Sequence, residues 1–84
     1  MLIYVWNLSL NVSENNFRDT FEAFGQVSFA IISSTILKDR LSDQPLRFAF
    51  VEMPNQAEAR AAIQNLNRKD IYGQQMIVYG SSEN

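Results

Sequence analysis

Aromatic side chains alternate with aliphatic ones in two separate segments of the chain. Residues 3–8 read Ile-Tyr-Val-Trp-Asn-Leu, and residues 48–52 read Phe-Ala-Phe-Val-Glu. Because successive residues of a β-strand point to opposite faces of a sheet, we expect Tyr4, Phe48 and Phe50 to share a face that the aliphatic core does not need. Exposed rings on a sheet stack unpaired nucleic-acid bases. Base stacking is therefore the chemistry that these residues offer.

Two amphipathic helices are predicted between the strands. Ser13 is a suitable N-cap for the first helix, and Gly25 suits its C-terminal end. The apolar stripe of this helix is Phe17, Phe21 and Phe24, which we assign to the core. The second helix begins near residues 54–55. Its stripe is Ala59, Ala62, Ile63 and Leu66.

The predicted elements follow the order β-α-β-β-α-β. Strands are expected at about residues 2–6, 27–33, 47–53 and 75–79, with a polar hairpin loop at residues 38–45. This order predicts a ferredoxin-like α+β fold, in which a four-stranded antiparallel sheet has two helices on one face. The other face stays open. We expect one domain at residues 1–80 and a short polar C-terminal end at residues 81–84.

The composition excludes several classes of site. The 84 residues include neither Cys nor His, so disulfides, thiolate metal sites and imidazole bases are absent. No Gly-rich loop precedes a helix as a phosphate cradle would require. We therefore expect neither an enzyme nor a cofactor or metal. The sequence lacks an apolar run of membrane-spanning length, and the default expectation is a cytoplasmic protein without membrane contact.

The charge balance argues against a conventional nucleic-acid binder. The net charge is −2 and the sequence pI is about 4.9. Nucleic-acid-binding domains usually carry a basic patch, because neutralisation of phosphates supplies much of their affinity. That contribution must be small here. A protein partner or a homodimer, using the same apolar face, is the alternative reading.

The two ring-bearing segments match a known family. Residues 3–8 fit the RNP2 signature, and residues 46–53 fit the central positions of the RNP1 octamer. The chain thus resembles an RNA recognition motif (RRM) domain over essentially its full length, and looks most like the small single-RRM proteins of bacteria. The resemblance implies binding of single-stranded RNA, or of single-stranded DNA. It implies that Tyr4 and Phe50 stack neighbouring bases, and that Phe48 lies against a sugar or a base.

The sequence departs from the family pattern at several basic positions. Leu46 replaces the first Lys or Arg of RNP1, and Arg47 replaces the following Gly. The parity of Arg47 directs it towards the helix side or the sheet margin, so it reaches a phosphate only by swinging round. Lys38 and Arg40 are either solvated charges or phosphate ligands. Arg68 occupies a turn position that is usually Gly in the family, where a positive φ would cost about 1 kcal/mol.

Four further residues are candidates for RNA binding, each with an alternative role. Trp6 either stacks a base, contacts a protein, or packs against Tyr79 or a loop. Tyr79 has the parity of the ring face but stands in a terminal strand. Asn7 either caps a turn or contacts a base. Glu52 would repel phosphate, so it either accepts a hydrogen bond from a base edge or pairs with an Arg.

Overall fold

The chain alternates strands and helices in the predicted order, with additional short strands. The structure is a computed structural model, and it describes residues 1–33, 35, 37–38, 40–41 and 45–81. Its elements are β1 (Leu2–Leu8), α1 (Glu14–Glu22), β2 (Phe29–Ile32), β3 (Leu37–Lys38), β4 (Pro45–Glu52), α2 (Gln56–Leu66), β5 (Asp70–Ile71), β6 (Gln74–Gln75) and β7 (Ile77–Gly80).

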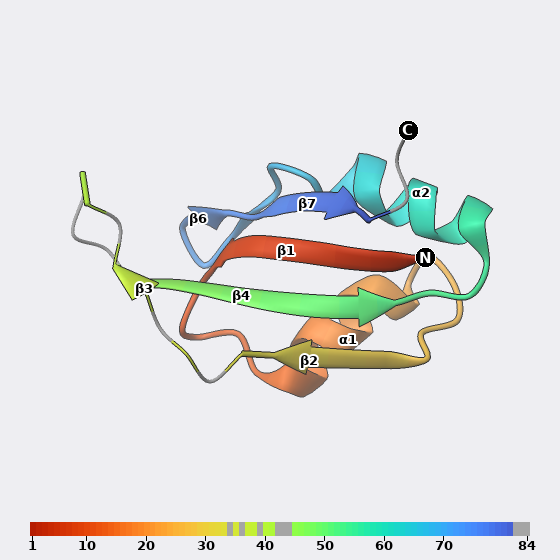
Figure 1. Cartoon of the computed structure of the whole chain (residues 1–84), viewed down its shortest axis with the longest axis horizontal. Helices are drawn as coiled ribbons and strands as arrows, with labels where there is room; N and C mark the ends of the chain where they lie inside the picture. The colour runs from red at the N-terminus through yellow and green to blue at the C-terminus, as the bar shows by residue number, and fades with distance from the viewer. Residues whose placement is uncertain (34, 36, 39, 42–44, 82–84) are drawn as a thin grey trace.

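The main sheet is antiparallel, with β4 and β1 at its centre. Its strand order is β2-β4-β1-β7 (Figure 1). The two-residue β3 pairs with the first two residues of β4, whereas β2 pairs with the last four. Figure 1 shows α1 behind β2 and β4, with α2 next to β7. The predicted ferredoxin-like α+β fold, with four main antiparallel strands and two helices on one face, is confirmed.

Side-chain caps begin both helices. The Ser13 hydroxyl oxygen accepts a hydrogen bond from the backbone N–H of Asn16, and the Asn55 side chain accepts one from the N–H of Glu58. Such caps satisfy backbone donors that have no partner within the helix. Gly25 follows α1 with a φ of 155° and lies against the Glu58 side chain, where a Cβ would clash. The predicted helix start at Ser13 is confirmed, and Gly25 does follow the end of α1.

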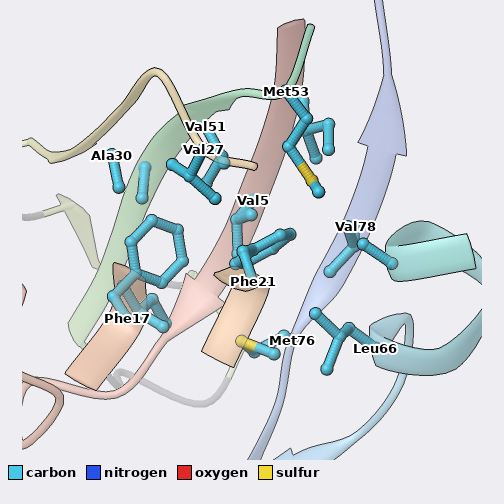
Figure 2. Close-up of a cluster of buried hydrophobic side chains, with 14 of the residues drawn as sticks. Val5, Phe17, Phe21, Val27, Ala30, Val51, Met53, Leu66, Met76 and Val78 are labelled. Atoms are coloured by element: carbon cyan, nitrogen blue, oxygen red, sulfur yellow. The ribbon is translucent and has the colours of Figure 1, made fainter. Parts of the chain in front are cut away.

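The core lies between the helices and one face of the sheet. Phe17 and Phe21 of α1 point towards the strands, and Leu66 of α2 lies near Val78 of β7 (Figure 2). Ile3, Val5, Ala49 and Val51 cover the sheet side of this core and are almost completely buried. Alternate residues of the central strands are thus committed to the core. Their neighbours in sequence must point the other way.

Several strand boundaries differ from the predictions. The predicted second strand, residues 27–33, is a strand only at Phe29–Ile32. Val27 and Ala30 are both buried, which breaks strict alternation between them. The third predicted strand begins earlier, since Pro45 is already paired with Lys38 of β3. Residues 39 and 42–44 of the predicted loop lie outside the described residues.

The predicted last strand, residues 75–79, is two strands. Gln74–Gln75 pairs with Asp70–Ile71 in a small hairpin, whereas Ile77–Gly80 pairs with β1. The hairpin turn consists of Tyr72 and Gly73, whose φ values are 53° and 81°. Two successive positive φ values are typical of a type I′ turn, which usually contains Asn-Gly or Asp-Gly. The turn sequence here is Tyr-Gly instead, so sequence analysis did not predict this hairpin.

Candidate nucleic-acid interface

Strand pairing brings the predicted rings together on the face that the helices leave open. Tyr4 of β1 is paired with Phe50 of β4 on one side and with Tyr79 of β7 on the other. Ile31 of β2 is paired with Phe50, so it extends the same face. We call this surface the ring face. Its residues are Leu2, Tyr4, Trp6, Phe29, Ile31, Phe48, Phe50, Glu52, Ile77 and Tyr79.

Five aromatic side chains form a closed circuit on the ring face. The Tyr4 ring stacks with Tyr79 at a centroid distance of 5.4 Å and meets Phe50 edge-on at 5.6 Å. Phe50 meets Phe48 edge-on at 5.8 Å, and Phe48 lies 5.1 Å from the tilted Trp6 ring. These distances lie in the favourable range for aromatic pairs. Each ring therefore helps to fix the orientation of its neighbours before any ligand arrives.

A hydrogen bond closes the circuit between Trp6 and Tyr79. The indole Nε1–H of Trp6 donates to the Tyr79 hydroxyl oxygen at 2.9 Å. One of the roles considered for Trp6 was packing against Tyr79, and the structure contains this contact. Tyr79 is 45% exposed and Trp6 is half-buried. Both side chains belong to the same continuous surface as the RNP rings.

Asn7 has a structural role in β1. Its φ is 61°, and the pairing of β1 with β4 shifts register between Val5 and Leu8. The Asn7 amide donates to the Gln75 carbonyl oxygen at 2.9 Å, and its side-chain oxygen accepts from the Gln74 amide at 3.3 Å. Asn tolerates a positive φ better than most residues. Both polar ends of the Asn7 side chain are hydrogen-bonded within the chain, a geometry that agrees with the turn-capping alternative.

Arg47 is held on the helix side of the sheet. Its Nη2 donates to the carbonyl oxygens of Ser9 and Val12, each at 2.7 Å, in the loop that joins β1 to α1. The prediction that its parity directs it away from the ring face is thus supported by its contacts. To reach a phosphate on the ring face, Arg47 would have to give up both of these hydrogen bonds.

The remaining charged candidates lie at opposite ends of the ring face. Lys38 and Arg40 are exposed at the β3 end, where β4 begins. Glu52 stands at the other end of β4, between Leu2 and Phe29 in the strand pairing. Its carboxylate lies 3.3 Å from the Met1 amine rather than beside an Arg. The alternative that Glu52 pairs with an Arg has no support among the described residues.

Other apolar residues lie on this face outside the set of predicted site residues. Phe29, Ile31 and Ile77 are 40%, 50% and 43% exposed. Leu2 of β1 is half-buried. These residues enlarge the apolar area on both sides of the aromatic circuit.

The described residues also line a cavity away from the rings. This cavity of about 550 Å³ is open to solvent and lies between α1 and the β5–β6 hairpin; it is lined by Val12, Asn16, Asp19, Thr20, Ile71 and Tyr72. None of the predicted site residues lines it. Within the described part of the chain, no cluster of acidic side chains could hold a metal ion. No helix there is long and apolar enough to cross a membrane.

Comparisons with known proteins agree with the geometry of the sheet. The chain is 34% identical over 76 residues to the chloroplastic organelle RRM domain-containing protein 6 of Arabidopsis thaliana. It is 36% identical over 76 residues to glycine-rich RNA-binding protein 1 of Mycosarcoma maydis. Each alignment covers 90% of this chain but only 40% and 41% of the two relatives. The chain therefore spans less than half the length of these curated relatives.

A solved structure and a family model extend the match to nearly the whole chain. The crystal structure of the RNA-binding protein PG1 superimposes with a TM-score of 0.73 at 32% identity, covering 100% of this chain and 96% of that one. The model of the RNA recognition motif family matches residues 3–77. These residues include all of β4 and all of β1 except Leu2. The chain belongs to the RNA recognition motif family.

Proposed function

We propose that the chain binds single-stranded RNA with little sequence preference by stacking bases on the ring face. The observation that carries this proposal is the contiguous set of Tyr4, Phe48 and Phe50 on the face opposite the helices. Tyr4 and Phe50 would each stack one base, and Phe48 would lie against a sugar or base. Membership of the RRM family and the RNA-binding relatives support this reading.

Stacking must supply most of the affinity in this proposal. Each stacked base contributes about 1–3 kcal/mol by alanine substitution, so two or three contacts give about 3–9 kcal/mol. A micromolar Kd needs about 8 kcal/mol. Phosphate contacts add little, because Arg47 is occupied elsewhere and the chain is acidic overall. The preorganised circuit of rings helps, since rings that are already ordered lose less conformational entropy on binding.

The experiment is a fluorescence anisotropy titration of a short, labelled single-stranded RNA of mixed sequence. We expect Phe50→Ala to weaken binding by about 5- to 150-fold, the equivalent of one lost stacking contact. Tyr72→Ala is the matched control, because Tyr72 is 62% exposed but lies on the hairpin away from the ring face. Equal affinities of Phe50→Ala and wild type would show that the proposed surface is wrong. A parallel titration with single-stranded DNA measures whether the affinity depends on the sugar.

A second candidate function uses the same face for a protein partner or a second copy of the chain. Its support is the apolar border formed by Phe29, Ile31 and Ile77, all well exposed. Exposed apolar patches of this kind are common at protein interfaces. Light scattering over a range of concentrations tests the homodimer. A mass that stays monomeric at high concentration excludes it, whereas a dimer lost in Ile31→Asp would support it.

A further inference from the structure

The hydrogen bond between Trp6 and Tyr79 leaves a hydroxyl hydrogen unused. The Trp indole is a donor only, so in the 2.9 Å contact the Tyr79 oxygen is the acceptor. Its own O–H has no acceptor among the described residues and is therefore available to solvent or to a ligand. A hydroxyl that accepts one hydrogen bond is polarised and becomes a better donor for the next. Tyr79 thus presents an oriented donor at the surface.

The surroundings of this donor are apolar and partly exposed. Ile77, which is 43% exposed, is paired with Trp6 across β1 and β7. Phe48 supports the Trp6 ring on the β4 side, at 5.1 Å between centroids. Tyr79 is itself held by stacking on Tyr4. An indole supported on one side, an aliphatic neighbour and a fixed hydroxyl donor together suit a flat ligand that carries an acceptor on its edge.

We propose that Trp6, Ile77 and Tyr79 form a subsite for one additional nucleotide, beside the two stacking positions on Tyr4 and Phe50. The base stacks on the indole of Trp6, and the Tyr79 hydroxyl donates to an acceptor atom of the same nucleotide. Every base carries a carbonyl oxygen or ring nitrogen that can accept such a bond, so this subsite is tolerant of sequence. The inference rests on the proposed RNA-binding function.

The chain offers a direct reporter, because Trp6 is its single tryptophan. The labelled RNA used for anisotropy is titrated while the anisotropy is recorded, and an unlabelled copy is titrated while Trp6 emission is recorded. We expect RNA to change the Trp6 emission with the same midpoint as the anisotropy. We also expect bound RNA to shield the indole from acrylamide, a soluble quencher. Shielding distinguishes a base that covers Trp6 from an indirect change in its environment.

Two conservative variants test the hydroxyl. Tyr79→Phe keeps the ring that stacks on Tyr4 but removes the hydroxyl, and with it the acceptor of the Trp6 indole, and should weaken binding by about two- to tenfold. Tyr72→Phe makes the same change at an exposed tyrosine off the ring face and should leave the affinity unchanged. Thermal melts of both variants show whether each is folded at the temperature of the titration.

The possible results distinguish failure of the subsite from failure of the proposed RNA-binding function. RNA that binds by anisotropy without shielding Trp6 would overturn the subsite and leave the stacking function intact. Tyr79→Phe with wild-type affinity would overturn the role of the hydroxyl. Absence of RNA binding by the wild type would overturn the proposed function itself. Shielding of Trp6 together with a selective effect of Tyr79→Phe would support the subsite.

Discussion

The guanidinium of Arg47 lies 2.7 Å from the carbonyl oxygen of Ser9, on the side of β4 opposite the rings. The same Nη2 also reaches the carbonyl oxygen of Val12. A residue at the second position of the RNP1 segment, where the family pattern has Gly, thus fastens the β1–α1 loop to the sheet. Ser9 and Val12 are both buried, so their carbonyls depend on this donor more than exposed ones would.

Arg47→Ala should destabilise the fold without changing the intrinsic affinity for RNA. The substitution removes two hydrogen bonds to buried carbonyl groups, of which Ser9 keeps a second donor in the Val12 N–H, at a cost of about 1–3 kcal/mol. For a domain of this size, 1 kcal/mol lowers the Tm by about 4–8 °C. Arg60→Ala, on an exposed face of α2, is the control and should change the Tm little. A variant with an unchanged Tm and weakened RNA binding would restore Arg47 as a phosphate ligand.

The affinity for RNA should depend only weakly on salt. Each phosphate neutralised on a single strand contributes about −0.7 to the slope of log K against log salt. If Lys38 and Arg40 supply the contacts, the slope is no steeper than about −1.4. Anisotropy titrations at several salt concentrations measure it, and Arg40→Ala should reduce its magnitude by about 0.7 if Arg40 is one of these contacts. A wild-type slope of about −3 or steeper would mean that other basic residues bind the backbone.

Arg68→Gly should raise the melting temperature. Arg68 has a φ of 69°, as its place at a usual Gly position suggested, and a side chain in this conformation costs about 1 kcal/mol. Part of this gain is offset, because Gly increases the entropy of the unfolded chain. We therefore expect a rise of a few degrees or less in a thermal melt.

The control for this prediction is the same substitution at a helical arginine. Arg60→Gly, within α2, should lower the stability by about 1 kcal/mol because Gly is unfavourable inside a helix. The opposite signs of the two Arg→Gly changes would trace the effect at Arg68 to its backbone conformation. A fall in Tm for Arg68→Gly would show instead that the arginine side chain stabilises the turn.

Sequence reasoning succeeded wherever side-chain alternation was decisive. Tyr4, Phe50 and Tyr79 were assigned to one face by parity alone, and strand pairing brings them together there. The helices could also be predicted, because the Ser13 cap and the Phe stripe are local sequence signals. Side-chain alternation could not predict the hydrogen-bond partners of each side chain. The carbonyls that bind Arg47, for example, come from residues distant in sequence.

The hairpin was missed because the backbone conformation of its turn is unusual for the residue type. Tyr72 adopts a positive φ there, a conformation that sequence patterns associate with Asn, Asp or Gly. The partners of Asn7 could not be predicted either, because its side chain is hydrogen-bonded to Gln74 and Gln75, which are distant in sequence.

The irregularity at Asn7 has a consequence for the rings themselves. A slip of β1 by one residue against β4 would turn Tyr4 and Trp6 into the core and expel Ile3 and Val5 onto the surface. The side chain of Asn7 is hydrogen-bonded to Gln74 and Gln75 of β6, and the same slip would pull it away from both partners. These bonds therefore oppose a change in register and help to keep Tyr4 and Trp6 on the surface.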